Sequence, residues 1–204
     1  MSHKQAILDK LRKHAPADMP HPGGDGPWSS FEDRVAQFTS MVEAVGGKCV
    51  SADDRFAVNR LLLESEVYTN AKKIYSAVEG VGTPTFDLEK VDDPHDLHDV
   101  DFAIYRGEFG VAENGAVWVT DEGLTHRVIY FIPQHVAIVL AYRSEPADCL
   151  VNQMHEAYQQ ISFGSPQFGL FISGPSKTAD IEQSLVIGAH GPRSLTVYLV
   201  RDDA

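Results

Sequence analysis

The alternation of helical and extended patterns near the start of the chain is the feature that most constrains the fold. A capping box at Ser29 and Glu32 begins an amphipathic helix, whose inner face carries apolar residues at steps of four, three, four and three: Phe31, Val35, Phe38, Val42 and Val45. A short strand over 48–51, a helix over 54–65 and a strand over 72–77 follow. This order is typical of βαβ units, so it predicts a parallel or mixed sheet.

The N-terminal part differs in pattern from the rest of the 204 residues. Apolar residues share one helical face within residues 3–14, but seven of the fourteen positions from Ala15 to Trp28 are Pro or Gly, which cannot continue a helix. We therefore expect a helical arm and a flexible linker over residues 1–28. One folded domain is expected over 29–204, a length that can bury a full core.

The remainder of the chain alternates strand and helix patterns around a hairpin signal. Asn114-Gly115 lies within an extended apolar run and is typical of a type I′ turn, which predicts antiparallel strands at the centre of the chain. A helix is expected to open at Pro146, with its inward face formed by Leu150, Met154, Tyr158 and Ile161. The other expected elements are an acidic loop over 92–101, strands over 101–106 and 109–120, apolar runs over 127–132 and 136–140, and a final strand, helix and strand over 169–173, 178–188 and 195–200.

The formal charge excludes one large class of partners. Lys and Arg number 17 against 29 Asp and Glu, which gives a net charge of −12. A protein that binds the phosphate backbone needs the opposite sign, so we expect no nucleic-acid partner. Hydrophobic residues at 43% and charged residues at 23% are ordinary values for a folded domain.

The cysteine count bears on redox chemistry. Cys49 and Cys149 stand a hundred residues apart, so the chain alone supplies neither a disulfide framework nor the ligands of an iron–sulfur cluster. We expect no cofactor and no metal in this chain, and electron chemistry would come from a partner protein. The longest near-apolar stretch, 128–142, is interrupted by Pro133-Gln134-His135 and is too short to span a bilayer, so a cytoplasmic location is expected.

The segment from Phe171 to Glu182 is the most informative candidate site. A buried strand runs through Gly174-Pro175 into the expected helix, whose free backbone N–H groups would face the turn and suit an anion. Hydroxyl groups and a positive charge for a phosphate or carboxylate would come from Ser173, Ser176, Thr178 and Lys177. The alternative is a capped turn, in which Asp180 and Glu182 complement the helix dipole and would repel an anion.

Glu113 is the second candidate, because it precedes Asn114-Gly115 at the end of an expected strand. A carboxylate placed there can act as a nucleophile or a general base. The alternative is a solvated side chain beside an ordinary hairpin turn. The sequences Gly-x-Ser-x-Gly and Gly-x-Gly-x-x-Gly are both absent, so a serine hydrolase and an ordinary NAD enzyme have no support.

Histidines beside turns are the third set of candidates. His135 and His190 could each exchange a proton near neutral pH, or could instead hydrogen-bond backbone groups at the ends of elements. His95 and His98 stand among five aspartates in the only cluster that resembles a set of metal ligands. A solvated acidic loop is favoured there, since nothing in the sequence holds the ligands in a defined geometry.

Three C-terminal segments resemble the LutC/YkgG family, which carries the lactate-utilisation LUD domain: Ile172–Glu182, Val186–Pro192 and Leu195–Val200. The stretch from Arg127 to His135 is similar to the family's Arg to Leu-Pro-x-His stretch. The turn at 112–115 resembles its Ala-Glu-Thr-Gly, with Asn114 in place of the threonine, and Thr196 stands where the family often has histidine. The resemblance covers residues 31–200.

The resemblance implies a three-layer α/β fold with a mixed, mostly parallel sheet, similar to the NagB/RpiA/CoA-transferase-like group. It implies a non-redox subunit of a lactate-utilisation system that oxidises L-lactate to pyruvate. Iron–sulfur clusters would be carried by partner proteins, and this chain would bind a small anionic ligand or the partner subunits. The alternative is a stand-alone enzyme similar to CoA transferases or sugar-phosphate isomerases, with Glu113 as its nucleophile or base.

We expect the candidate groups to converge in one cleft at strand ends, where open α/β sheets bind ligands. The candidate catalytic residues are Glu113, His135 and His190. The candidate ligand-binding residues are Asn114, Gly115, Arg127, Ser173, Gly174, Ser176, Lys177 and Thr178.

Overall fold

The computed structural model describes residues 3–14, 26, 28–162, 164, 168–181 and 184–201. Its helices and strands, in chain order, are α1 (His3–Lys13), α2 (Arg34–Ala44), β1 (Lys48–Ala52), α3 (Arg55–Glu64), α4 (Glu66–Thr69), β2 (Ile74–Ser76), β3 (Phe102–Gly107), β4 (Phe109–Val111), β5 (Ala116–Thr120), β6 (His135–Tyr142), β7 (Leu150–Val151), α5 (Met154–Gln160), β8 (Gly169–Ile172), β9 (Lys177–Ile181), β10 (Ser184–Ile187) and β11 (Ser194–Arg201). Short 3-10 helices occur at Leu88–Lys90, Pro94–Leu97, Arg127–Tyr130 and Pro146–Cys149.

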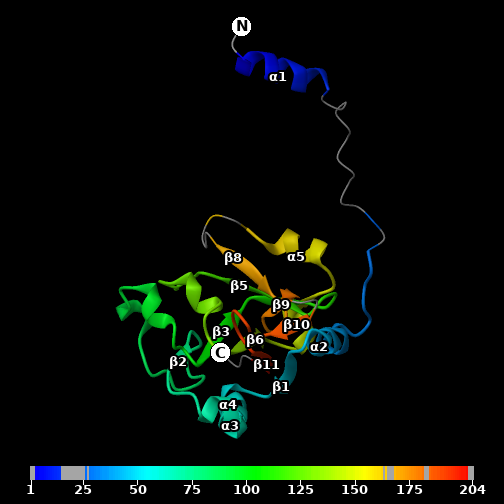
Figure 1. Ribbon diagram of the computed structural model, residues 1–204. Coiled ribbons are helices and arrows are strands. Elements are labelled where there is room, and N and C mark those ends of the chain that lie inside the picture. The colour runs from blue at the N-terminus through cyan, green and yellow to red at the C-terminus, as the bar shows by residue number, and fades with distance from the viewer. Residues whose placement is uncertain are drawn as a thin grey trace.

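A five-stranded sheet in the order β1-β11-β6-β3-β2 forms the centre of the protein (Figure 1). Every neighbouring pair in this sheet runs parallel, which confirms the sheet type expected from the alternation of elements. Its inner strands are apolar on both faces, because both faces are covered by other elements.

Alternate residues of β11 show how the two faces are covered. Val197 and Leu199 belong to a core cluster that includes Phe38 and Val42 of α2. Tyr198 and Val200 belong to a separate cluster that includes residues of α3 and α4. Since successive side chains of a strand point to opposite faces, one strand contributes to two separate cores. In Figure 1, α3 and α4 lie on one side of the central sheet and β5, β8 and α5 on the other.

A second, four-stranded sheet in the order β7-β4-β5-β8 forms the third layer. The β4–β5 and β5–β8 pairs are antiparallel, which confirms the antiparallel strands expected at the centre of the chain. Val117 and Val119 of β5 pack in the core shared with the central sheet, whereas Trp118 packs with Phe171 and Ala157 in a cluster beneath α5. The α/β class with a mostly parallel sheet is therefore confirmed.

The N-terminal capping residue of α2 differs from the one expected. The helix begins at Arg34, and the side chain of Asp33 accepts a hydrogen bond of 2.9 Å from the Ala36 N–H. The expected capping box at Ser29 and Glu32 is therefore wrong, since the helix starts later. An aspartate at this position satisfies one of the free N–H groups of the first turn, as Asp54 does for α3.

The prediction of a helix that opens at Pro146 is also wrong for most of its length. Pro146–Cys149 is a single 3-10 turn, and Leu150 and Val151 then pair in parallel with Gly110 and Val111 of β4. Pairing with β4 interrupts the helical spacing, and only Met154–Gln160 continues as α5. Tyr158, one of the expected inward residues, is 63% exposed.

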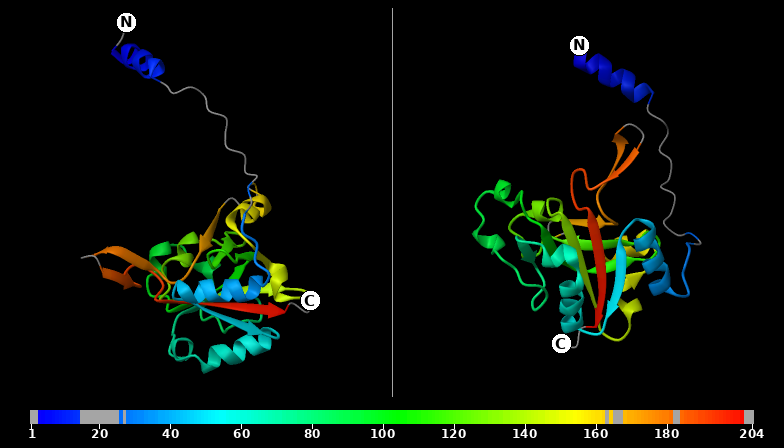
Figure 2. Two further views of the ribbon diagram at one scale, coloured as in Figure 1. Left: turned by 90° about the vertical axis from the view of Figure 1, so that its right-hand side faces the viewer. Right: turned by 60° about the horizontal axis from the view of Figure 1, so that its bottom comes forward.

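The helix expected over 178–188 is absent, and the structure has the antiparallel hairpin of β9 and β10 in its place. Thr178 pairs with Val186, and Lys177 pairs with Ile187. These pairs are rich in β-branched residues, which favour strands over helices. Figure 2 shows this hairpin projecting from the edge of the domain.

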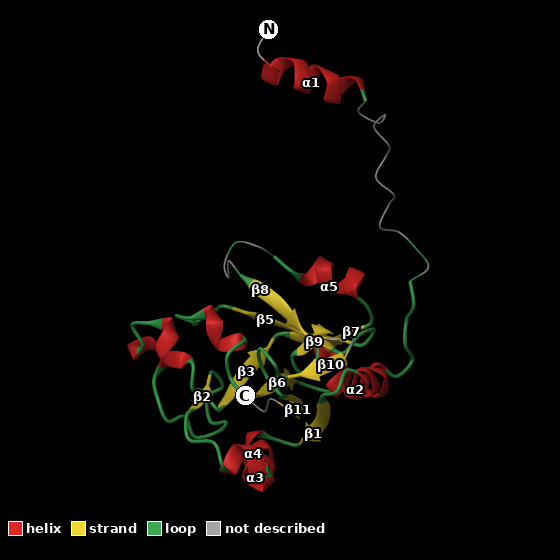
Figure 3. Cartoon of the chain, in the orientation of Figure 1, coloured by secondary structure: helices red, strands yellow, loops and turns green. Residues whose placement is uncertain are grey.

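The expected arm is only partly described. α1 is helical as predicted and has no buried residue. The expected linker falls mostly on residues 15–25 and 27, which lie outside the described residues. At Trp28 the chain contacts the domain, because the indole ring stacks on His155 with 3.8 Å between ring centroids. Within the residues that Figure 3 colours by secondary structure, no helix is long and apolar enough to cross a bilayer.

Candidate functional site

The turn that follows β8 lines a cavity of about 240 Å³. Ser173, Gly174 and Ser176 lie on one side of it, and His190 lies on the segment that leads into β11. Its other lining residues are mostly apolar: Tyr130, Phe131, Val136, Leu170, Phe171, Ile172, Pro175, Pro192 and Leu195. The structure therefore brings four of the predicted site residues together.

Hydrogen bonds hold the two walls of this cavity against each other. The Ser176 N–H donates to the Pro192 carbonyl at 2.8 Å, and the Gly188 N–H donates to the Ser176 carbonyl at 2.9 Å. The Ser176 hydroxyl also lies 3.4 Å from the His190 carbonyl, to which it donates. The His190 backbone is thus held across the opening by Ser176, as are its neighbours Gly188 and Pro192.

The turn at 112–115 lies beside the same site. The Ser173 hydroxyl donates to the Asn114 carbonyl at 2.9 Å. Gly115 and Gly174 both have positive φ, and both approach the C-terminal part of α2 closely: a Cβ atom would lie 2.7 Å from the Val42 nitrogen at Gly115 and 2.6 Å from the Val45 carbonyl oxygen at Gly174. The loop between β4 and β5 has four residues, so the expected two-residue type I′ turn is wrong.

Glu113 belongs to this turn, but its carboxylate is directed to another element. Its Oε2 atom accepts a hydrogen bond of 3.0 Å from the backbone N–H of Met154, the first residue of α5. The side chain is exposed and is not among the residues that line the cavity. In this arrangement Glu113 satisfies a free N–H group of a helix start.

The structural basis expected for anion binding after Ser176 is not present. Lys177 and Thr178 belong to β9, so no helix N-terminus faces the turn, and the expectation of a helix dipole at this site is wrong. Lys177 is exposed, and its ammonium group remains a positive charge one residue after the cavity-lining Ser176.

His135 lines a different cavity, of about 370 Å³, at the amino-terminal ends of the central strands. Its Nδ1 atom lies 2.8 Å from the Ser194 hydroxyl. Burial lowers the pKa of His135, the nearby Arg193 lowers it further, and Asp101 acts in the opposite direction. These changes favour the neutral imidazole, which can accept a proton near neutral pH. Sequence analysis missed Asp101, Arg193 and Ser194, which are distant from His135 along the chain or follow no motif.

Arg127 lies outside both cavities. Its Nη2 atom is 2.6 Å from Asp121 Oδ2, and its guanidinium packs over the ring of Phe168 at 4.9 Å. Burial by itself raises the pKa of Asp121, but the Phe168 N–H and Arg127 hold the carboxyl below its usual pKa. The expectation of one cleft that unites Glu113, Arg127, His135 and the turn after β8 is therefore wrong.

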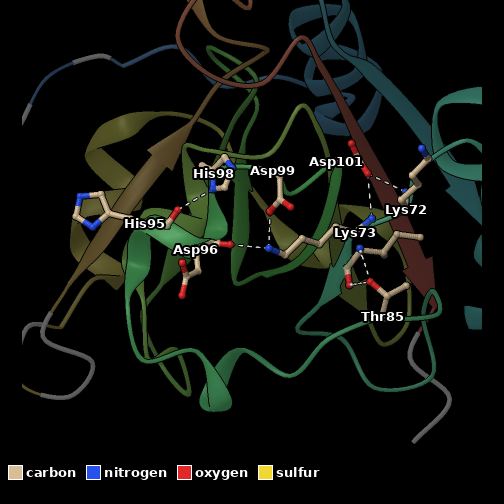
Figure 4. Close-up of polar contacts among 9 residues, drawn as sticks. Lys72, Lys73, Thr85, His95, Asp96, His98, Asp99 and Asp101 are labelled. Atoms are coloured by element: carbon tan, nitrogen blue, oxygen red, sulfur yellow. Dashed lines mark hydrogen bonds and ion pairs between the residues drawn. The ribbon is translucent and has the colours of Figure 1, made fainter.

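The acidic loop before β3 is tied to the central sheet (Figure 4). Lys73 donates to the Asp96 carbonyl at 2.5 Å and forms an ion pair with Asp99. The Asp101 carboxylate accepts hydrogen bonds from the backbone N–H groups of Lys72 and Lys73. His98 Nδ1 lies 3.0 Å from the His95 carbonyl oxygen. In the described part of the chain, no three or more His, Cys, Asp or Glu residues are placed to hold a metal ion.

Burial shifts the acidity of both cysteines in the same direction. Burial raises the pKa of the Cys149 thiol to about 12. Burial also raises the pKa of Cys49, although a hydrogen bond with Thr39 opposes the shift. The thiolate is the form that attacks disulfides, and burial disfavours it at both side chains.

The parallel sheet, its covering second sheet and the turns at their edge define a three-layer α/β domain. A family model described as LUD domain matches residues 79–200. The chain belongs to the LUD domain family.

Comparisons with individual proteins agree with this assignment. Lactate utilization protein C 1 of Bacillus mycoides (strain KBAB4) is 30% identical over 155 residues, which cover 69% of this chain and 64% of that protein. Lactate utilization protein C of Geobacillus thermodenitrificans (strain NG80-2) is 36% identical over 102 residues, 47% of this chain and 40% of that protein. The chain thus spans less than two thirds of these relatives.

A crystal structure of a DUF162 family protein from Deinococcus radiodurans shares the fold, with a TM-score of 0.60 and 14% sequence identity. The similarity covers 83% of this chain and 96% of that chain.

Proposed function

We propose that the chain takes part in lactate utilisation as the non-redox subunit of an iron–sulfur system that oxidises L-lactate to pyruvate. The observation that carries this proposal is membership of the LUD domain family, together with relatives named lactate utilization protein C. In this arrangement the electrons pass to iron–sulfur clusters of partner proteins, and this chain binds a ligand or the partners.

The burial and the small number of the cysteines support the assignment of the iron–sulfur clusters to partner proteins. Cys149 is buried, and burial raises the pKa of its thiol to about 12, which disfavours the free thiolate. Iron–sulfur clusters are held by several Cys thiolates, and this chain has two cysteines in total. The cysteine count supports the assignment of electron transfer to partners that are richer in cysteine.

The cavity beside the turn at 173–176 is the proposed site for a small carboxylate such as lactate. Ser173 and Ser176 supply hydroxyl groups, and His190 and Lys177 supply polar or charged groups at the edge. The apolar lining excludes water from the methyl end of such a ligand, which strengthens hydrogen bonds to its carboxylate. The Asn114 carbonyl supports this turn by accepting the Ser173 hydroxyl, and Gly115 lets the same loop lie close to α2.

A stand-alone enzyme with Glu113 as nucleophile receives less support from the geometry. The carboxylate already accepts the Met154 N–H and lies outside the cavity, whereas a nucleophile must reach the substrate directly. A base or nucleophile in this position would have to break the hydrogen bond that begins α5.

Genetic complementation tests the proposed role. In a bacterial strain that lacks its own lactate utilization protein C, expression of this chain should restore growth on L-lactate, with growth on acetate as the matched control. The variant Lys177→Ala should lower lactate-dependent growth because it removes the charge beside the cavity, while Lys48→Ala, an exposed lysine on β1, should not. If the wild-type chain is expressed and folded but does not restore growth, the proposed role is contradicted.

A further inference from the structure

The helix α3 is apolar on two opposite sides. Val58 and Leu62 are buried and pack in the core cluster beneath the helix. Phe56 and Leu63 lie on the other side, about two turns apart, and are 84% and 68% exposed. A surface helix carries its apolar residues on the side that faces the core and polar residues on the opposite side. The exposed side of α3 therefore departs from the pattern of a helix that only covers a sheet.

The exposed apolar residues continue beyond the end of α3. The short helix α4 follows after one residue, and its Val67 is 41% exposed. Arg60 is exposed between Phe56 and Leu63. Phe56, Arg60, Leu63 and Val67 are called the outer face of α3 below. In Figure 1 the two helices lie at the outside of the molecule, away from β5, β8 and α5. Apolar residues grouped on a surface in this way are typical of an interaction site.

Two opposite charges stand at this face, one turn apart along α3. Arg60 comes first and Glu64 follows, and both side chains are exposed. Among the residues that the structure describes, neither side chain has an ion pair or a hydrogen bond. Both charges therefore remain for a partner of complementary pattern.

The other charged groups near α3 are directed elsewhere. The Asp54 carboxylate caps the first turn of the helix through a hydrogen bond of 2.7 Å. Arg55 donates to the Glu79 carbonyl at 3.2 Å. Glu66 lines the cavity of about 370 Å³ at the amino-terminal ends of the central strands. Asp53 is exposed but precedes the helix. The charge pattern of the outer face is thus set by Arg60 and Glu64.

An antiparallel pairing of two α3 helices across a two-fold axis satisfies this pattern. With the axis level with the midpoint between Arg60 and Glu64, Arg60 lies opposite the partner's Glu64, and symmetry repeats the contact. The partner's Arg60 is then about 6 Å further along the helix axis, so attraction exceeds repulsion. The same pairing brings Leu63 close to the partner's Leu63 and sets Phe56 opposite the partner's Val67.

We infer that the outer face of α3 binds a second copy of this chain in a symmetric dimer. A two-fold interface needs one face to carry both members of each ion pair, and this face does so. The face is small, so the dimer is weak. None of its residues lines the cavity beside the turn at 173–176, so the inference goes beyond the proposed function.

Sedimentation velocity of the purified chain tests the inference. Protein concentrations run from about 1 µM to about 1 mM, the range of a weak interface. The buffer contains about 0.15 M salt, which screens the repulsion between two chains of net charge −12. The wild type should pass from monomer to dimer over this range. Leu63→Asp should abolish the dimer, because it places unpaired charges at the centre of the interface. Tyr158→Asp puts the same charge on an exposed residue of α5 and should leave the dimer unchanged.

Charge variants test the pairing of the two helices. Arg60→Glu and Glu64→Arg should each weaken the dimer about tenfold, because each replaces two attractions by two like-charge contacts. An equal mixture of the two variants should associate nearly as well as the wild type, since one chain then supplies two glutamates and the other two arginines. An effect that acts only within one helix would not be reversed by mixing.

Thermal melting must first show that each variant is folded as well as the wild type. The inference is overturned if the wild type stays monomeric at every concentration, which would leave the outer face to a different partner. It is equally overturned if Leu63→Asp dimerises as well as the wild type, or if the mixed charge variants associate no better than each alone. Because these measurements need neither lactate nor partner proteins, their outcome is independent of the proposed role in lactate utilisation.

Discussion

The carboxylate of Glu113 caps α5, through a hydrogen bond of 3.0 Å from the backbone N–H of Met154. This contact joins the loop between β4 and β5 to a helix 41 positions further along the chain. Glu113, which the sequence marks as a candidate catalytic residue, therefore has a structural role as a helix cap.

Removing this cap should destabilise the domain. Glu113→Ala is expected to lower the free energy of unfolding by about 1 kcal/mol, because it leaves an N–H group of the first turn without its side-chain acceptor. Glu113→Gln should cost less, since the amide oxygen can still accept the bond. Urea denaturation of both variants measures the difference, and equal losses would contradict the capping role.

Gly115 should tolerate a side chain poorly, for two separable reasons. It has a φ of +65°, and a Cβ atom would lie 2.7 Å from the Val42 nitrogen of α2. Gly123 has a φ of +72° but nothing within 4 Å, so Gly123→Ala reports the backbone strain alone. We expect Gly123→Ala to cost about 1 kcal/mol and Gly115→Ala more than about 2 kcal/mol, both measured by thermal or urea unfolding. Similar costs for both would show that the contact with α2 is unimportant.

His135 should make stability depend on pH. Burial, followed by Arg193, lowers its pKa in the folded state, so the unfolded chain binds the proton more readily. The resulting stability is present above the unfolded-state pKa of about 6.5 and is lost as the pH falls through the folded-state pKa.

Replacing this histidine should therefore flatten the pH profile. We expect the urea midpoint of His135→Gln to change less between pH 7.5 and pH 5.5 than that of the wild type. His3→Gln, in α1 where no residue is buried, is the control and should keep the wild-type profile. A His135→Gln profile as steep as the wild type would rule out this histidine as the source.

Trp28 and α1 should contribute unequally to stability. Trp28→Ala removes a ring stacked on His155 and is expected to cost about 1 kcal/mol. Deleting residues 1–14 should leave the melting temperature unchanged, since α1 has no buried residue. A large fall in the melting temperature on deletion of residues 1–14 would show that α1 packs against the domain or against another copy of the chain.

The sequence predicts the parallel sheet because the patterns that indicate its helices and strands are local. The periodicity of α2, the order of β1, α3 and β2, and the turn before β5 all depend on neighbouring residues. The hairpin of β9 and β10 was mistaken for a helix because helical spacing and strand pairing compete in a short apolar segment, and pairing prevailed.

The site was less predictable than the fold. Its contacts join residues that are far apart in the chain, such as Ser173 with Asn114, and His135 with Ser194. The pattern of an apolar strand followed by Gly174-Pro175 located the turn after β8, whereas geometry was needed to show what lies around it.

The most direct test of the role in lactate utilisation is L-lactate-dependent reduction of a dye by the reconstituted system. The proposed iron–sulfur partner proteins would be purified and assayed with and without this chain, and pyruvate formation would be measured in parallel. The account predicts that the chain alone is inactive, that the partners alone reduce the dye slowly, and that the mixture restores both dye reduction and pyruvate formation. Equal rates with and without this chain, from folded and cluster-loaded partners, would contradict it.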